Sequence, residues 1–247
     1  MPLTSHGLGL WLLLAAAAFS VADDTAQWKA TAARLTLAID ASPSSVDLYS
    51  QRGDARFFLG EFATAVADYD KMVELNAAED AGHWRRGIAW FYAGEFEKAA
   101  GQFERYHSFD NVDRENGIWR NLCQRKAFGL EKALAGLLKY EKDDREPFGD
   151  VYRLFEGKIT ADELLDKIRQ AKISDTEREK RLFYAELYVG LNEAVEGRAD
   201  SAKSHLSAAA KNSWGEKAGY GPNYMWQVAR LHAELLAKPV VPEKAQP

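Results

Sequence analysis

The stretch that decides the fold contains one pattern twice, as YSQRGDARFFLGEFATAVADYDKMV in Tyr49–Val73 and as HWRRGIAWFYAGEFEKAAGQFERYH in His83–His107. The two copies begin 34 residues apart, and their glycine, aromatic and alanine positions coincide. The matched pairs are Gly53 with Gly87, Phe57 with Phe91, Gly60 with Gly94, Glu61 with Glu95, Phe62 with Phe96, Ala65 with Ala99, and Tyr69 with Phe103. An internal repeat of this length predicts a chain built from stacked supersecondary units.

Each copy predicts two short helices joined by a tight turn. Large apolar residues recur at helical spacing in Asp47–Leu59, and Gly60 then supplies the left-handed backbone that ends the first helix. The apolar residues that follow lie three and four apart, so they share one face of a second helix. Glycine inside a helix, as at Gly53, costs about 1 kcal/mol relative to alanine. We therefore expect a close approach of the two helices there, with Ala65 or its counterpart Ala99 as the matching small residue.

This unit resembles the tetratricopeptide repeat, or TPR, a helix-turn-helix repeat of the same length. The signature positions hold Gly53, Ala65 and Tyr69 in the first copy, and Gly87, Ala99 and Phe103 in the second. The chain departs from the family at Arg52 and Arg86, which stand where the family has leucine. The resemblance implies an all-α fold, a right-handed α-solenoid of TPR units with an irregular helical insertion and a C-terminal capping helix.

The same period organises the rest of the chain. It predicts a TPR domain over residues 23–237, divided into a half repeat (24–45), two repeats (46–79 and 80–113), a degenerate repeat (114–147), a helical insertion (148–182), a further repeat (183–216) and a capping helix (217–237), with a disordered tail at 238–247. This order resembles the NlpI-type TPR lipoproteins of the bacterial cell envelope. That resemblance implies a non-catalytic adaptor for envelope proteases and peptidoglycan hydrolases, although this chain lacks the cysteine that is lipidated in those proteins.

Residues 1–22 have the form of a secretory signal peptide. Leu8–Val21 is an apolar run rich in leucine and alanine, too short to span a bilayer, and Ser20-Val21-Ala22 is typical of a cleavage site. We expect cleavage after Ala22, no stable membrane insertion after signal removal, and an exported protein in the periplasm, the cell envelope or the secreted fraction. An uncleaved anchor or a non-targeting start is the alternative, because no Lys or Arg precedes the apolar run.

Composition and motifs argue against several other functions. The net charge of -5 and the pI near 5.6 disfavour nucleic-acid binding, because phosphate neutralisation needs clustered Lys and Arg. The histidines lack metal-ligand spacing, no catalytic or nucleotide-binding motif is present, and the lone Cys123 is typical of a buried apolar residue. The sequence predicts no catalytic residue, no metal and no cofactor, with an enzyme of unrecognised site as an alternative.

The first helices of stacked TPR units line a concave groove, and we take its positions as the partner site. The residues assigned to partner binding are Phe57, Phe58, Trp84, Arg85, Ile88, Phe91, Tyr92, Ile118 and Arg125. Aromatic anchors with a charged margin suit a peptide or a partner helix, and Trp84 and Tyr92 are the strongest candidates. The alternative is that the three phenylalanines are core and that Arg85 pairs with a neighbouring carboxylate.

These observations predict a non-catalytic TPR scaffold that binds a peptide or a partner helix in its groove, in the cell envelope or another exported compartment. The partner class that the resemblance implies is an envelope protease or hydrolase. The alternative function is a self-assembling structural protein that homodimerises through the Met225–Leu235 helix or through the aromatic surface.

Overall fold

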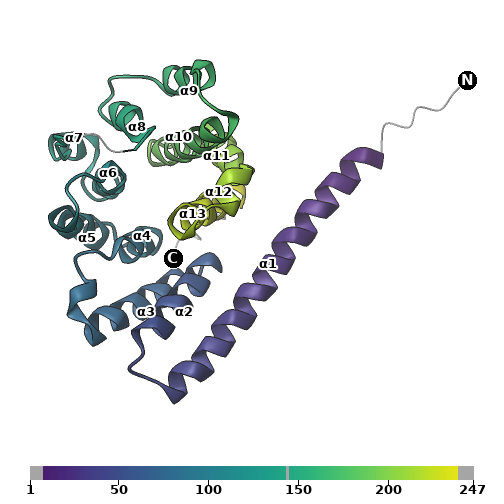
Figure 1. Ribbon diagram of the computed structural model, residues 1–247, viewed down its shortest axis with the longest axis vertical. Coiled ribbons are helices and arrows are strands. Elements are labelled where there is room, and N and C mark those ends of the chain that lie inside the picture. The colour runs from purple at the N-terminus through teal and green to yellow at the C-terminus, as the bar shows by residue number, and fades with distance from the viewer. Residues whose placement is uncertain (1–7, 143–144, 239–247) are drawn as a thin grey trace, which may run out of the picture. The chain divides into compact units, whose positions relative to one another are not determined.

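The computed structural model describes residues 8–142 and 145–238, with side chains from residue 24 onward (Figure 1). Every regular element in these residues is a helix. The elements are α1 (Leu8–Ala41), α2 (Val46–Phe58), α3 (Phe62–Leu75), the 3-10 turn η1 (Ala77–Glu79), α4 (Trp84–Tyr92), α5 (Phe96–Phe109), α6 (Arg114–Phe128), α7 (Leu130–Ala135), α8 (Phe148–Phe155), α9 (Ala161–Gln170), α10 (Asp175–Val195), α11 (Ala199–Ala210), α12 (Ser213–Lys217) and α13 (Tyr220–Ala237). The predicted all-α class is confirmed for this part of the chain.

The chain divides into two compact units, Met1–Glu79 and Asp80–Pro247. In the first unit, α2 and α3 form the predicted hairpin. Gly60 between them has a φ of +77°, and its N–H donates to the carbonyl oxygen of Phe57 at 2.8 Å. Helix α1 packs against α2, where the ring centroids of Trp28 and Phe58 lie 4.8 Å apart.

Helix α1 is longer than expected, because it begins at Leu8 and not at Asp24. Leucine and alanine are strong helix formers, so the backbone of the apolar run continues the helix through the predicted cleavage site. Residues 1–7 lie outside the described residues, and the signal peptide stays a prediction. The tail predicted at 238–247 also lies outside them, apart from Lys238.

The second unit contains α4 to α13 (Figure 1). The hairpins α4/α5 and α10/α11 repeat the turn of the first unit, with Gly94 at a φ of +83° and Gly197 at +81°. The last helix, α13, returns to lie beside α4, and the ring centroids of Trp84 and Tyr224 are 4.9 Å apart. The second unit is therefore held together by contacts between its two ends as well as between consecutive helices.

The helices depart from the strict period in three places. Helix α7 ends at Ala135, so Leu137, which stands one repeat length after Phe103 and is expected on the same helical face, lies outside any helix. Helix α10 begins at Asp175, well before the repeat predicted at 183, and the short helix α12 was not expected. The sequence Thr160-Ala161-Asp162-Glu163 predicts a capping box, and this is confirmed, because Thr160 and Glu163 exchange hydrogen bonds at the start of α9.

The two arginines that break the family pattern join the helices of each hairpin. Arg52 of α2 pairs with Asp68 of α3, with 2.7 Å between Nη2 and Oδ1. Arg86 stands one repeat length after Arg52, and its Nε donates to Oε1 of Gln102 at 3.0 Å. In both hairpins the acceptor lies sixteen residues after the arginine. In the third repeat Arg120 donates to the backbone carbonyl of Gly136, just beyond the truncated α7. An arginine at the same position of three successive repeats thus forms a hydrogen bond or an ion pair with the residue sixteen positions later.

Glycines inside the first helices allow the close approach that the sequence predicts. A Cβ on Gly53 would lie 2.5 Å from Cε1 of Tyr69, and one on Gly87 would lie 2.7 Å from Cζ of Phe103. The atoms nearest each glycine therefore belong to the aromatic residue of the second helix, not to the alanine that we expected opposite it. Gly190 of α10 repeats the arrangement against Leu206 of α11.

We expect Gly87→Ala to destabilise the protein by about 1–3 kcal/mol, because the new methyl group must displace the buried ring of Phe103. Gly101→Ala is the matched control, since a Cβ there meets only an Arg105 nitrogen at 3.7 Å. This control should gain up to about 1 kcal/mol from helix propensity alone. Urea unfolding measures both changes, and a stabilised Gly87→Ala variant would contradict the packing argument.

Candidate functional site

The nine predicted partner-binding residues occur in both units, and the two in the first unit are buried. Phe57 is 0% exposed and its ring packs on Phe62, with centroids 5.4 Å apart. Phe58 is 6% exposed and packs on Trp28. Their burial matches the core alternative that the sequence left open, and it does not support contact with a partner.

Four of the seven in the second unit also serve the fold. Ile88, Phe91 and Ile118 are buried, and only Ile88 of these borders a cavity. Arg125 joins α6 to α10, because its Nη1 lies 2.8 Å from Oε1 of Glu196 and 3.0 Å from Oδ1 of Asn192. A charged side chain held by two acceptors of the same chain is a structural clamp.

The other three, Trp84, Arg85 and Tyr92, contact helix α13. The Trp84 ring packs edge-on against Tyr224, and the guanidinium of Arg85 lies 5.6 Å from the ring centroid of Tyr220. The hydroxyl of Tyr92 is joined to Nδ1 of His232 by a hydrogen bond of 2.9 Å. The face predicted to bind a partner helix is thus partly covered by the chain's own last helix.

Helix α13 uses its apolar face for this contact and for α11. Met225, Val228 and Leu231 are buried, and Leu235 remains 38% exposed. The surface predicted for homodimerisation is therefore largely covered within the chain. The period of the repeat gives no information on this contact, because Tyr92 and His232 are 140 residues apart in the sequence.

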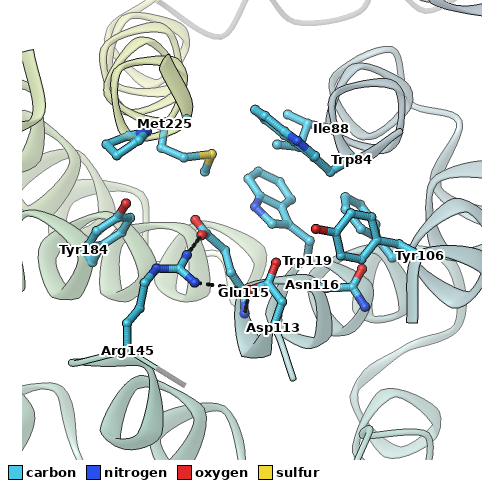
Figure 2. A pocket seen from close by; sticks show the side chains of 13 residues that line it. Trp84, Ile88, Tyr106, Asp113, Glu115, Asn116, Trp119, Arg145, Tyr184 and Met225 are labelled. Carbon is cyan, nitrogen blue, oxygen red and sulfur yellow. Dashed lines mark hydrogen bonds and ion pairs between the residues drawn. The ribbon is translucent and has the colours of Figure 1, made fainter. Parts of the chain in front are cut away.

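A cavity of about 300 Å³ lies within the second unit, between α4, α5, α6, α10 and α13 (Figure 2). Its lining is mostly aromatic and apolar, with a small group of polar side chains. The lining residues are Trp84, Ile88, Phe103, Tyr106, Asp113, Glu115, Asn116, Trp119, Arg145, Tyr184, Gly221, Pro222 and Met225. We call this cavity the central pocket. A concave aromatic site with a few convergent polar groups is the usual form of a binding site.

The charged side chains of the central pocket come from the start of α6 and from the segment before α8. Asp113 is the N-cap of α6 and accepts a hydrogen bond from the N–H of Glu115 at 3.0 Å. Arg145 pairs with Glu115, and its Nη1 lies 3.6 Å from Oδ1 of Asp113 (Figure 2). Glu115 also accepts a hydrogen bond from the hydroxyl of Tyr188. Two carboxylates therefore share one guanidinium at the pocket.

The guanidinium of Arg145 also lies against aromatic rings. It is 4.2 Å from the ring centroid of Phe148 and 5.8 Å from that of Tyr184. Burial raises the pKa of Tyr184 and of Tyr106 well above the ordinary value, with neighbouring carboxylates adding to it. The phenols of the pocket are neutral at physiological pH, so its charge is carried by Asp113, Glu115 and Arg145.

Two buried polar groups of the pocket have no hydrogen-bond partner. Asn116 is 3% exposed, and neither Oδ1 nor Nδ2 of its amide is paired. Trp119 is 2% exposed, its ring stacks on Phe103 at 6.1 Å, and its Nε1 is likewise unpaired. Buried polar groups are normally satisfied, so these two mark a place where a ligand can add hydrogen bonds.

Sequence reasoning assigned Trp84 and Ile88 of the central pocket to the partner site, and it did not include Asp113, Glu115 or Arg145 in that site. Glu115 lies three residues before Ile118 on one helical face, and this spacing was the available signal. Arg145, Tyr184 and Met225 come from elements outside the two clear repeats, where no spacing relates them to the groove. In the described residues, no three His, Cys, Asp or Glu side chains are placed to hold a metal ion. Among the same residues, none of the helices combines the length and the apolar character needed to cross a membrane.

No protein-family model matches the chain. A stretch of 52 residues is 40% identical to the protein SGT1 homolog of Oryza sativa subsp. japonica. The match covers 21% of this chain and 14% of the plant protein. Because so little of either chain is matched, the activity and partners of that protein do not transfer to this one.

The contact between Tyr92 and His232 predicts a loss of stability in acid. Burial, together with a smaller effect of the nearby charge of Lys126, lowers the pKa of His232 to about 4. A folded pKa below the unfolded value of about 6.5 means that stability is complete above pH 6.5 and falls as the pH approaches 4. The loss from this residue should reach at most about 3 kcal/mol, since one pKa unit corresponds to about 1.4 kcal/mol.

We expect His232→Gln to be less stable than the wild type at pH 7 and to show a shallower fall in stability between pH 6.5 and 4. Urea unfolding at a series of pH values measures this slope. Part of the slope should remain, because burial also lowers the pKa of His83 to about 3. An unchanged slope in the variant would show that His232 is not the titrating group.

Proposed function

We propose that the chain is a non-catalytic, TPR-type adaptor that binds a partner polypeptide at the central pocket of its second unit. The observation that carries this proposal is the pocket itself, with aromatic walls, a shared ion pair and two unpaired buried polar groups. Aromatic and arginine side chains gathered around a recess are typical of protein recognition sites. The proposal assigns recognition, and no chemical reaction, to these residues.

The TPR assignment is supported by agreement between the repeat and the hairpins. Gly60, Gly94 and Gly197 each end a first helix with a positive φ. Three first helices carry an internal glycine against a large side chain of the second helix. We call the contacts of Arg52, Arg86 and Arg120 with the residue sixteen positions later the arginine clamp, and this clamp recurs once in each of three repeats. A right-handed stack of these hairpins with a concave inner side is part of the proposal.

The structure changes which residues we assign to the partner. Trp84 stays in the proposed site, because it lines the central pocket and remains partly exposed. Ile88 forms part of the wall, and Arg145, Glu115 and Asp113 supply the polar margin. The remaining predicted residues are assigned to the fold. We retain an envelope protease or hydrolase as the expected partner class, on the basis of the resemblance alone.

Photo-crosslinking tests this site. We expect p-benzoylphenylalanine at position 84 to crosslink a partner protein in cells that express the chain, because residue 84 borders the pocket. The matched control carries the same amino acid at position 128, where Phe128 is 40% exposed and does not line the pocket. Mass spectrometry identifies the crosslinked protein, and its affinity for the purified chain is then measured directly.

The outcomes separate the candidate functions. A heterologous protein crosslinked from position 84 and not from position 128 supports the adaptor. Crosslinks only between copies of this chain would favour the self-assembling alternative. Equal yields from both positions would remove the central pocket from the proposal.

We further propose that residues 1–22 act as a signal peptide and that the protein is exported. Mass spectrometry of the protein recovered from cells should give a mature chain that begins at Asp23. Ala22→Asp should abolish processing, because signal peptidase requires a small residue at that position. A recovered chain that still carries residues 1–22 would contradict export by cleavage and would leave the adaptor proposal intact.

A further inference from the structure

The charged residues that line the central pocket are two carboxylates and one guanidinium. Asp113 and Glu115 both pair with Arg145, and their side chains are 19% and 14% exposed. Both carboxylates are fixed on the first turn of α6, where Asp113 caps the helix. A cation brought by a ligand would therefore meet two carboxylates at the wall of the pocket.

The walls of the central pocket also favour a cation with an apolar stem. Trp84, Tyr106, Trp119 and Tyr184 present aromatic surface, and Ile88 and Met225 are aliphatic (Figure 2). Aromatic faces attract Lys and Arg, most strongly where water is excluded. The stems of these side chains bury against apolar surface while the charged end keeps polar partners.

The volume of the pocket limits the size of this ligand. About 300 Å³ is at the lower end of the range for ligand sites, which suits one long side chain and not a large cofactor. The unpaired Oδ1 of Asn116 offers a further acceptor beside the carboxylates. Arg and Lys are the side chains that carry several donors on a long apolar stem.

Arg145 shows how a guanidinium is accommodated here. It pairs with Glu115, lies against the rings of Phe148 and Tyr184, and has a side chain that is 40% exposed. It belongs to the segment between α7 and α8, whereas the carboxylates belong to a helix. A ligand cation would compete with Arg145 for the same two carboxylates.

We propose that the central pocket binds an arginine or lysine side chain of the partner polypeptide, which inserts between Trp84 and the Asp113–Glu115 carboxylates in competition with Arg145. This inference rests on the proposed function and names the chemistry by which the partner is recognised. A glutamine side chain, which could donate to and accept from Asn116, is the competing ligand.

The test uses the full chain labelled with 5-fluorotryptophan and followed by fluorine NMR. The chain has seven tryptophans, and Trp84→Phe and Trp119→Phe variants assign the two resonances of the pocket. The probes are capped peptides Gly-Gly-Xaa-Gly-Gly with Arg, Lys, Gln or Glu at the centre. We expect Arg and Lys to shift both resonances with a Kd at least about tenfold lower than that of Gln, and Glu to cause no shift.

Two variants should act in opposite directions. Glu115→Gln should weaken binding of the Arg peptide about fivefold, because it removes one of the two carboxylates that line the pocket. Arg145→Gln should strengthen binding about threefold, because it removes the competing cation. A merely structural role for Arg145 predicts weaker binding instead. Glu104→Gln is the matched control, since it also breaks an arginine pair, with Arg120, outside the pocket, and it should leave the Kd unchanged.

Other outcomes overturn the inference. Equal affinity for the Gln and Arg peptides, or weaker binding by Arg145→Gln, removes the cation from the proposal. If Glu115→Gln fails to fold in a urea unfolding control, the direction of the Arg145→Gln effect decides. A partner that crosslinks from position 84 with an affinity unchanged by Glu115→Gln defeats this inference and leaves the adaptor. If the Arg peptide binds but no protein crosslinks from position 84, the cation preference of the pocket is supported and the adaptor proposal is contradicted.

Discussion

The structure depends on the distance at which the two helices of a hairpin can approach each other. Where Gly53 and Gly87 lie, there is no room for even one methyl group beside the rings of Tyr69 and Phe103. A missing side chain on one helix thus makes space for the largest side chain on the other. The helix loses about 1 kcal/mol of intrinsic propensity at each glycine, and the buried aromatic surface more than offsets that loss. What recurs from one repeat to the next is therefore this fit between a glycine of the first helix and an aromatic ring of the second.

The arginine clamp fixes the alignment of the two helices of a hairpin, which apolar packing alone does not specify. In the first hairpin Arg52 and Arg56 of one helix both reach Asp68 of the next, which is 2% exposed. A buried carboxylate is tolerated only where it is paired, so this contact fixes how the helices are aligned along their axes. In the second hairpin a neutral glutamine accepts from the arginine. In the third a backbone carbonyl does so, and there the second helix is short. The arginine thus keeps its position in the repeat, while its partner changes from a charged carboxylate to a neutral oxygen.

The second unit brings its last helix, α13, against its first helix, α4, and both helices contribute to the central pocket. Helix α13 brings Tyr224 against Trp84 and His232 against Tyr92, and of these four residues Trp84 lines the central pocket. The enclosed space collects the start of α6, where Asp113 and Glu115 meet Arg145. Recognition in such a site depends on a single inserted side chain more than on a long docked helix. The proposed partner chemistry follows from this enclosure.

The sequence by itself determined the elements of this protein: the helical class, the turn glycines at Gly60 and Gly94, the capping box at Thr160 and the close approach at Gly53. Each of these depends on residues a few positions apart or one repeat apart, which periodicity and local propensity reveal. Only the tertiary structure decided which aromatic residues are covered, because Trp84 and Tyr92 meet residues of α13 that lie far along the chain. It also decided that Glu115 and Arg145 share one pocket with Met225. Contacts of this kind join residues that are distant in the sequence, and no local pattern of residues contains that information.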